Sequence, residues 1–216
     1  MSYKKTKLIP GNTQPVEVQE EFVKEYEKLK ESAEKGEIHL LFFDPTHQVH
    51  NTINGTCWQT KGKRGTVILP SNTGRRRISV LGALNSITGS CTTIITENNC
   101  DKDMIIATFN EIRKEYPDDK EIVIILDNAS YNHAYKTLEE SALLGIRLVF
   151  LPTYSPNLNL IERLWKFLKK VVLKNKYYKT FSEFKKAIEA FFENIQIYKD
   201  NILKLLNHRF EILKAE

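Results

Sequence analysis

Two kinds of apolar pattern occur along the chain and predict its secondary structure. Apolar residues that recur every three or four positions are typical of helices with one buried face, whereas short continuous apolar runs indicate buried strands. The helical pattern occupies the segments 16–35, 101–116, about 134–144, a stretch that starts at Leu160, and 202–213. The strand pattern occupies the segments 38–43, 77–84, 90–96, 121–126 and 146–151. Thr180 and Glu183 form a capping-box pattern that opens one further helix.

The order of these elements predicts the fold class and the domain limits. Residues 85–89 join the second and third strands and have turn chemistry, so we expect an antiparallel hairpin there. The later strands alternate with helices, which favours an α/β fold with a mixed sheet flanked by helices. Residues 1–37 are interpreted as a polar linker and an entry helix. Residues 38–216 would form one domain with C-terminal helices, which is long enough to bury a core.

The segment 46–76 interrupts the regular pattern. It contains several glycines and much of the basic charge, so we interpret it as a hairpin or a long functional loop. The strand before it is expected to end at Asp44, because Pro45 cannot donate to a central ladder.

The composition favours a soluble intracellular protein. Hydrophobic residues make up 41% of the chain, and no apolar run approaches the roughly 20 residues that a membrane-spanning helix needs. The first residues lack the apolar segment and the cleavage site of a secretory signal. Cys57, Cys91 and Cys100 lack paired spacing, so we expect reduced, mostly buried thiols with neither a disulfide nor a zinc site. The expected location is the cytoplasm.

The distribution of basic residues is more informative than the net charge of +5. One cluster lies around the segment 46–76 and consists of Lys61, Lys63, Arg64, Arg75, Arg76 and Arg77. A second cluster lies in the helix that starts at Leu160 and includes Arg163, Lys166, Lys169 and Lys170. Two basic surfaces suit a polyanionic partner such as DNA. A single charge cluster is more often an ordinary solvated face, so each cluster alone is weak evidence for such a partner.

Two aspartates each follow a buried strand. Asp44 follows the first apolar run, and Asp127 follows the run 121–126 and opens a polar turn. Ligands gather at the carboxyl ends of strands in an open sheet, so these two side chains are expected to be neighbours. A turn-former or a helix cap is the alternative interpretation of either residue alone.

Glu162 is the third candidate carboxylate. One interpretation is a capping box, in which Asn159 is the N-cap and Glu162 bonds only to the backbone. The other places Glu162 at the edge of the helix's apolar stripe, facing the strand ends and next to the basic face. Three carboxylates could hold a pair of Mg²⁺ ions, which activate an attacking oxygen and stabilise a leaving one in phosphodiester displacement. Trp165 belongs to the apolar stripe and is interpreted as a core residue.

The segment 151–165 resembles the signature around the third acid of insertion-sequence transposases of the mariner superfamily. It reads L-P-T-Y-S-P-N-L-N-L-I-E-R-L-W and contains Glu162. The family's second acid lies in a turn similar to Asp127-Asn128-Ala129, and its first acid ends an early strand, as Asp44 does here. The resemblance runs from about residue 38 to residue 173.

This resemblance implies a ribonuclease-H-like fold and cut-and-paste chemistry. A transposase of this kind hydrolyses DNA at the element ends and then joins the freed 3′-hydroxyl to target DNA, here expected at a TA dinucleotide. It implies Asp44, Asp127 and Glu162 as catalytic residues and as ligands of Mg²⁺ or Mn²⁺, with two ions expected. The implied partners are double-stranded DNA, as transposon ends and target, and a second copy of the chain in the DNA complex. The expected setting is the interior of a bacterial or archaeal cell.

Several features depart from the family pattern. Pro45 stands where relatives often carry a second acid, Leu160 stands where they often carry proline, and Asn132 stands where a histidine is frequent. His133 follows and is assigned no role beyond that of a surface histidine. Full-length relatives carry helix-turn-helix modules for which residues 1–37 are too short. An excised domain, one half of a split transposase and a remnant all remain open.

Two other functions compete with transposition. A transposase-derived domain could bind DNA without performing chemistry, or the domain could be another ribonuclease-H-like nuclease.

Overall fold

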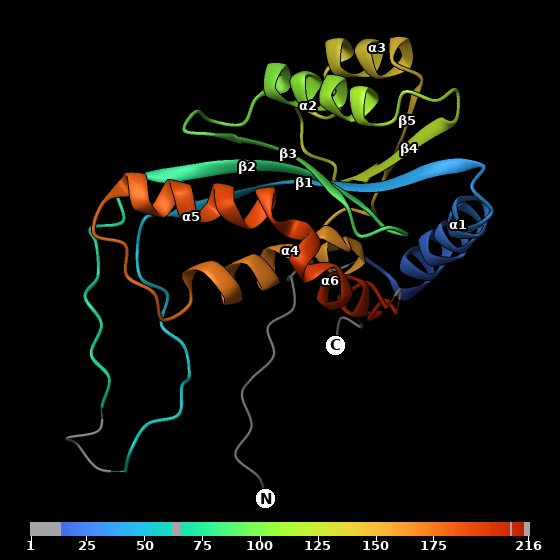
Figure 1. Cartoon of the computed structure of the whole chain (residues 1–216). Helices are drawn as coiled ribbons and strands as arrows, with labels where there is room; N and C mark the ends of the chain where they lie inside the picture. The colour runs from blue at the N-terminus through green and yellow to red at the C-terminus, as the bar shows by residue number, and fades with distance from the viewer. Residues whose placement is uncertain (1–13, 62–65, 208, 214–216) are drawn as a thin grey trace, which may run out of the picture.

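The computed structural model describes residues 14–61, 66–207 and 209–213, and a five-stranded sheet forms its centre (Figure 1). In chain order the strands are β1 (Ile38–Val49), β2 (Arg77–Asn85), β3 (Cys91–Thr96), β4 (Glu121–Leu126) and β5 (Ile146–Phe150). The order across the sheet is β3-β2-β1-β4-β5. β2 runs antiparallel to both β1 and β3, whereas β1, β4 and β5 are mutually parallel. The mixed sheet and the β2–β3 hairpin predicted from the sequence are therefore confirmed.

Helices cover both faces of this sheet (Figure 1). One face carries α2 (Lys102–Glu115) and α3 (Tyr135–Leu143). The other carries α1 (Val16–Glu34), α4 (Ile161–Leu168), α5 (Phe181–Glu193) and α6 (Lys199–Leu205). Three short helical segments lie among these elements: Pro156–Leu158 precedes α4, Lys169–Leu173 follows it, and Ile195–Tyr198 joins α5 to α6. The capping box predicted at Thr180 and Glu183 is present at the start of α5.

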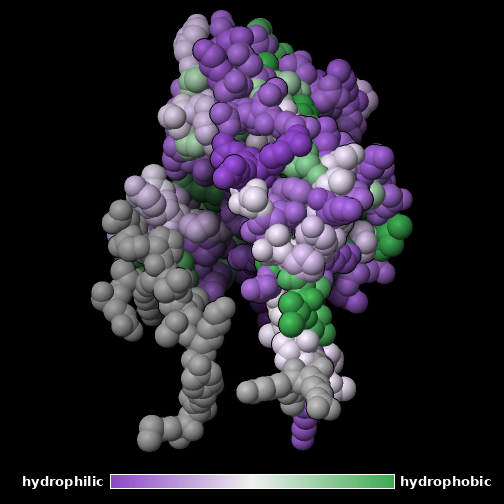
Figure 2. Space-filling model, turned by 90° about the vertical axis from the view of Figure 1, so that its left-hand side faces the viewer, coloured by the Kyte–Doolittle hydropathy of each residue, from purple (hydrophilic) through white to green (hydrophobic). Residues whose placement is uncertain are grey.

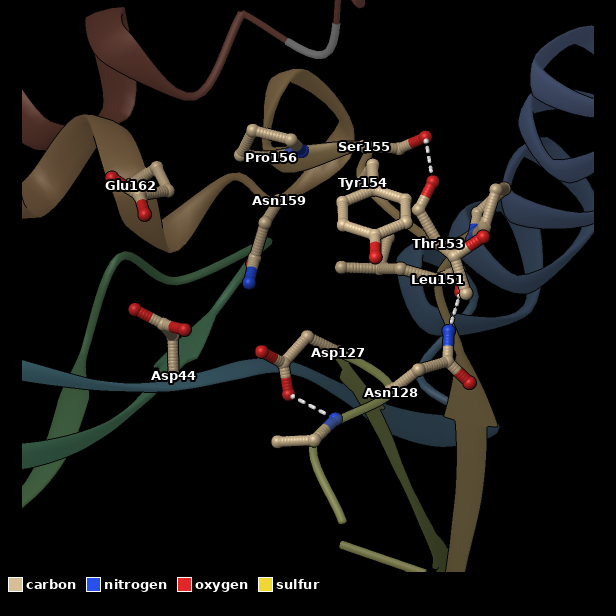
Figure 3. A pocket seen from close by; sticks show the side chains of 12 residues that line it. Asp44, Asp127, Asn128, Leu151, Thr153, Tyr154, Ser155, Pro156, Asn159 and Glu162 are labelled. Atoms are coloured by element: carbon tan, nitrogen blue, oxygen red, sulfur yellow. Dashed lines mark hydrogen bonds between the residues drawn. The ribbon is translucent and has the colours of Figure 1, made fainter. Parts of the chain in front are cut away.

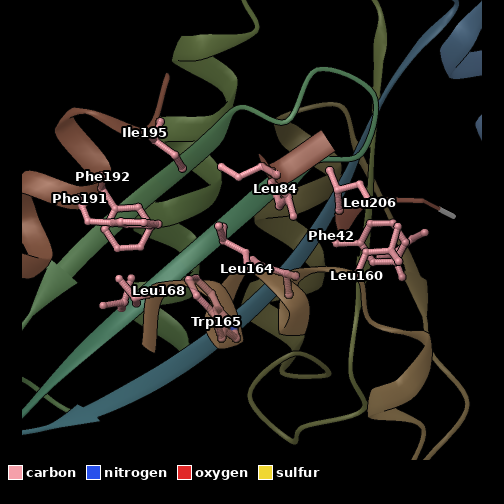
Figure 4. Packing of buried hydrophobic residues seen from close by; sticks show 14 of the residues in the cluster. Phe42, Leu84, Leu160, Leu164, Trp165, Leu168, Phe191, Phe192, Ile195 and Leu206 are labelled. Atoms are coloured by element: carbon pink, nitrogen blue, oxygen red, sulfur yellow. The ribbon is translucent and has the colours of Figure 1, made fainter. Parts of the chain in front are cut away.

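Each face of the sheet buries its own core, because successive strand side chains point to opposite faces. In β1, Leu40 and Phe42 belong to the core under α4 and α5, whereas Leu41 and Phe43 belong to the core under α2. The first core is the larger, and aromatic rings from α4 and α5 meet within it (Figure 4). Trp165 is 1% exposed there, so its interpretation as a core residue is confirmed.

β1 continues through Asp44 and Pro45 to Val49, so the expectation that proline ends this strand is wrong. The carbonyl of Leu40 accepts from the N–H of Ser86, so the main-chain polar groups of Leu40 face β2. These groups alternate between the two edges of a strand, and those of Pro45, five residues on, therefore face the opposite edge. On that edge the pairing with β4 ends at Phe42. The missing N–H of proline therefore breaks no ladder bond, and β1 stays paired with β2 alone.

The segment between β1 and β2 is a long arm with little regular structure, consistent with a long loop rather than a hairpin (Figure 1). Hydrogen bonds from Thr52 to Pro70 and from Val67 to Gln59 link its two sides. Trp58 on this arm is fully exposed, at 104%. Figure 2 shows the side of the molecule from which the arm projects, where hydrophilic residues cover most of the body. Lys63 and Arg64 of the first basic cluster lie outside the described residues.

The last predicted helix is shorter than expected, since α6 ends at Leu205. Residues 209–213 instead run back along α1 in a non-helical conformation. Phe210 packs on Phe22 and Tyr26 of α1, and Leu213 is buried. None of the helices in the described residues is both long and apolar enough to cross a membrane. Cys57 is exposed, which corrects the expectation of mostly buried thiols at that position.

Candidate active site

Three carboxylates from three separate elements line one cavity of about 380 Å³ (Figure 3). Asp44 belongs to β1, Asp127 directly follows β4, and Glu162 lies in the first turn of α4. β4 stops at Leu126 while β1 continues past it, so the cavity opens where the parallel pairing ends. The structure therefore brings together the three acidic residues that the sequence pattern singled out.

Asp44 is the carboxylate most affected by its surroundings. Burial, together with the negative charges of Glu162 and Asp127, raises the pKa of its carboxyl group to about 8. A hydrogen bond from the indole Nε1–H of Trp165 to Asp44 Oδ2, at 2.9 Å, opposes this rise. A cation would relieve the repulsion among the three acids.

The turn that follows β4 holds the side chain of Asp127 in place. Asp127 Oδ1 accepts from the main-chain N–H of Ala129 at 3.1 Å and from Asn132 Nδ2 at 2.8 Å. Asn132 is fully buried and also donates to the main-chain carbonyl of Asp127. Asn132 thus fixes the orientation of the second acid. The signal in the sequence was its place in the family pattern, five residues after that acid.

His133 lies beside this turn and remains exposed, as the sequence indicated. Its ring stacks on Phe150 with centroids 4.1 Å apart, and its Nε2 lies 3.1 Å from Asn128 Oδ1. Asn128 in turn donates to the carbonyl of Leu151 and lines the cavity. The histidine supports the cavity wall through Asn128 and does not line the cavity itself.

The capping-box interpretation of Glu162 is wrong. The N-cap residue of α4 is Leu160, and no side chain caps the helix. The N–H of Glu162 bonds to the main-chain oxygen of Asn159 at 3.2 Å. The side-chain Nδ2 of Asn159 reaches the carbonyl of Phe43 at 3.5 Å, on the edge of β1 beyond the end of its pairing with β4. The carboxylate of Glu162 is therefore not used to cap α4.

The donor set fits a hard divalent cation. Mg²⁺ and Mn²⁺ prefer oxygen ligands, and three carboxylates line the cavity. Among the described residues, no three acidic, histidine or cysteine side chains converge tightly enough to hold one ion as they stand. The chemistry of the residues fits the ion, and the side chains line the cavity without meeting at one point.

The loop between β5 and α4 forms the remaining wall of the cavity. This wall includes Leu151, Pro152, Thr153, Tyr154, Ser155 and Pro156. Tyr154 is 60% exposed and has a φ of 55°, in the left-handed region that non-glycine residues rarely adopt. The wall therefore presents an aromatic ring beside the acids.

Most of the predicted basic residues lie at the surface. Lys61, Arg75, Arg76 and Arg77 are exposed on the arm or at its base, and Lys166, Lys169 and Lys170 are exposed on α4 and the segment after it. Two of them have partners on the protein. Arg76 pairs with Glu97 and lies 3.6 Å over the ring of Phe181, and Arg77 donates to Asn99.

Arg163 differs from the rest of the predicted DNA-binding set. Its guanidinium donates to the carbonyls of Leu205 and Arg209 and to Asn207 Oδ1, and it is partly buried. Its N–H groups therefore hold the C-terminal segment against α4. The sequence placed Arg163 on the basic face because the return of that segment could not be read from helical periodicity.

Comparisons with known proteins agree with this site. Residues 39–185 match the family described as DDE superfamily endonuclease. The chain belongs to this family. It is 27% identical over 163 residues to an insertion element IS630 protein of 39 kDa from Shigella sonnei, covering 73% of this chain and 46% of that protein. It is also 31% identical over 84 residues to an uncharacterized protein of Sinorhizobium fredii, covering 39% of this chain and 60% of that protein. The chain thus spans about half the length of the curated relatives it matches.

Solved structures of the Mos1 mariner transposase share the fold. The catalytic domain of Mos1 superposes with a TM-score of 0.60 at 12% identity, covering 89% of this chain and 87% of that one. The chain in a pre-cleavage Mos1 transpososome superposes with a TM-score of 0.70 at 14% identity, covering 96% of this chain and 65% of that one. The ribonuclease-H-like fold is therefore confirmed for this member of the DDE superfamily.

Proposed function

We propose that this domain cleaves DNA at the ends of a mobile element and transfers the freed strand to target DNA. Asp44, Asp127 and Glu162 would hold the Mg²⁺ or Mn²⁺ ions, two in number, that this chemistry requires. The observation that carries the proposal is that these three carboxylates, from three elements, line one cavity in a member of the DDE superfamily. Mos1 structures described as paired end complexes with Mn and with Mg support the choice of cation by similarity.

Each residue of the site has a different role in this proposal. Bound divalent ions would supply Lewis-acid activation of the phosphodiester and of the attacking oxygen. Asp44 lines the cavity together with the other two acids, whose charges both act on its carboxyl group, and it is suited to bind a cation there. Asn132 keeps one oxygen of Asp127 engaged and leaves the other free. Glu162 lies on α4, and its carboxylate makes no capping bond that cation binding would have to break.

The basic surfaces would hold the DNA. Lysine and arginine contacts to phosphates position a duplex without reading its sequence. The proposed contact residues are Lys61, Lys63, Arg64, Arg75, Arg76, Arg77, Lys166, Lys169 and Lys170. A TA target, a homodimer in the DNA complex and a location inside a bacterial cell are part of the proposal, supported by similarity to an insertion-element protein and to Mos1 complexes.

The deciding experiment replaces Glu162 with glutamine. The protein is incubated with pre-nicked element-end DNA, a target plasmid and Mg²⁺ or Mn²⁺, and the joints are sequenced. We expect Glu162→Gln to keep its fold and DNA affinity, with a stability change within about 1 kcal/mol, and to lose cleavage and strand transfer because an amide is a poor ligand for the cation. Glu139→Gln on the exposed side of α3 is the matched control and should keep full activity. A well-folded Glu162→Gln protein that cuts at the parental rate would refute the assignment.

A second candidate function is DNA binding without chemistry. The observation that favours it is that the three carboxylates do not converge on one point in the described residues. Duplex binding without nicking in either cation, together with no stabilisation of the protein by Mn²⁺, would support this alternative over the transposase.

A further inference from the structure

The only polar atom of the Trp165 side chain is directed at the active site. Trp165 is 1% exposed in the core under α4, yet its Nε1–H donates to Asp44 Oδ2 at 2.9 Å. A buried indole N–H needs an acceptor, and many acceptors would serve a purely structural role. Here the acceptor is a carboxylate that lines the cavity. The core position of the ring and the contact with Asp44 are therefore separate properties.

Helical spacing links this donor to Glu162. Residues three apart in a helix lie on neighbouring positions of one side, so Glu162 and Trp165 both face the region of Asp44. Glu162 lines the same cavity as Asp44, and Trp165 binds the Asp44 carboxylate from within the core. α4 thus brings both a candidate ligand and a hydrogen-bond donor to the first acid.

Gly82 provides the space that the indole occupies. It is the β2 partner of Asp44 in the register of the sheet. A Cβ atom at Gly82 would lie 3.0 Å from Cζ2 of Trp165 and only 2.5 Å from Cη2, and the second distance is shorter than real Cβ atoms show. Its backbone is not among those with positive φ, so conformational freedom does not explain the glycine. The absence of a side chain lets the ring lie against β2 directly beside Asp44.

A second polar contact fixes the same junction. Asn159, just before α4, is 4% exposed, and its Nδ2 reaches the carbonyl of Phe43 at 3.5 Å. That carbonyl belongs to the residue preceding Asp44, beyond the point where β4 ceases to pair with β1. Asn159, just before α4, and Trp165, within α4, therefore contact consecutive residues of β1, Phe43 and Asp44.

We propose that Trp165 is a positioning residue for the metal-binding carboxylate of Asp44. Its indole N–H occupies Oδ2, so the carboxylate keeps one orientation and Oδ1 is left for the cation. Gly82 is part of the same arrangement because it admits the ring. This inference rests on the proposed function, in which Asp44 is a metal ligand. Removal of a hydrogen bond that orients a metal ligand typically lowers metal affinity by about 10- to 100-fold.

The fluorescence of Trp165 can report on cation binding, because the chain contains only one other tryptophan, Trp58. Trp58 is fully exposed on the arm, so Trp58→Phe leaves Trp165 as the single indole without disturbing the core. Mg²⁺ is titrated into this protein while its fluorescence is recorded, and Mn²⁺ affinity is measured independently by calorimetry. We expect the Trp165 emission to change with cation concentration and to saturate with binding, because a cation on Asp44 alters the field at the indole N–H.

The test variant is Trp165→Phe, which keeps an aromatic ring in the core and removes the N–H. We expect its Mn²⁺ affinity to fall about tenfold or more. Phe192→Leu is the matched control, because Phe192 packs edge-on against Trp165 with ring centroids 6.3 Å apart and does not line the cavity. This control should lose stability and keep its Mn²⁺ affinity. Gly82→Ala in the Trp58→Phe background should lower Mn²⁺ affinity by displacing the ring.

The outcomes separate the inference from the function on which it rests. Absence of Mn²⁺ binding by the Trp58→Phe protein would overturn the proposed function and the inference with it. Normal Mn²⁺ binding with an unchanged affinity in Trp165→Phe would overturn the inference alone. If Trp165→Phe does not fold, two other measurements test the inference. It would be overturned if the emission of Trp165 did not change at saturating Mg²⁺ and the Mn²⁺ affinity of Gly82→Ala were unaltered.

Discussion

Replacement of Asp44 with asparagine should stabilise the metal-free protein, although it removes one of the three proposed metal ligands. Asparagine has nearly the same shape as aspartate, and its side-chain oxygen can still accept from Trp165. The substitution removes a carboxyl group whose pKa is raised to about 8 by burial and by the charges of Glu162 and Asp127. Ionisation of this group in the folded protein therefore costs free energy that the amide does not.

The magnitude and the sign follow from proton linkage. The carboxyl titrates near its ordinary value of 3.8 in the unfolded chain and at about 8 in the folded protein. Between these two values the folded protein holds a proton that the unfolded chain has released. The free energy of unfolding therefore falls as pH rises, by about 1.4 kcal/mol per pH unit, and levels off above the folded pKa. From pH 5 to pH 7 the free energy of unfolding of the wild-type protein should fall by about 3 kcal/mol because of this group, whereas that of Asp44→Asn should show no such fall.

The assay is urea unfolding in the presence of a chelator at pH 5, 6, 7 and 8. The quantity of interest is the difference in unfolding free energy between Asp44→Asn and wild type, because titrating groups that do not interact with Asp44 cancel in it. We expect this difference to grow with pH across the series. Asp119→Asn, at an exposed position, is the control and should show no such growth. A difference for Asp44→Asn that is the same at every pH would refute the electrostatic reasoning.

Three further predictions concern the metal, the DNA surface and the C-terminal segment. Mg²⁺ or Mn²⁺ should raise the melting temperature of the wild-type protein, and Asp127→Asn should abolish this rise; a variant with an unchanged shift would exclude Asp127 as a ligand. Alanine at Arg75, Arg76 and Arg77 together should lower duplex affinity equally for unrelated sequences and flatten its salt dependence, by about one unit of slope per lost phosphate contact. Titrations at several salt concentrations measure this, and an unaltered slope would mean a solvated face. Arg163→Ala should instead lose roughly 2–4 kcal/mol of stability in urea unfolding, because its charged hydrogen bonds hold the C-terminal segment, and it should keep the wild-type salt slope; a flattened slope would return Arg163 to the DNA surface.

Much of the fold could be read from local pattern, because burial of one side of an element leaves its period in the sequence. The limits of β4 were predicted to the residue, and those of β2, β3, α1 and α2 within one or two positions. The order of a hairpin followed by alternating helices and strands was enough to indicate a mixed sheet. The catalytic candidates followed from where the apolar runs end, since polar side chains at strand ends gather at one edge of a sheet.

Contacts between distant segments left no periodic trace, and only the tertiary structure decided them. The passage of β1 through Pro45 depends on where β4 stops, which is a property of a different segment. By sequence alone Arg163 is one more cation on a basic helix face, and only the structure shows that it binds the carbonyls of Leu205 and Arg209.

The sequence by itself singled out the candidate residues for chemistry: Asp44 and Asp127 are marked by their place at the ends of apolar runs, and Glu162 by its place in the segment 151–165. The tertiary structure decided how each of them is held. Asn132 binds Asp127 within one turn, whereas Trp165 reaches Asp44 across 121 residues of chain. A side chain's partners depend on the three-dimensional meeting of strand edges and helix faces, and periodicity along one segment records only that the segment is buried.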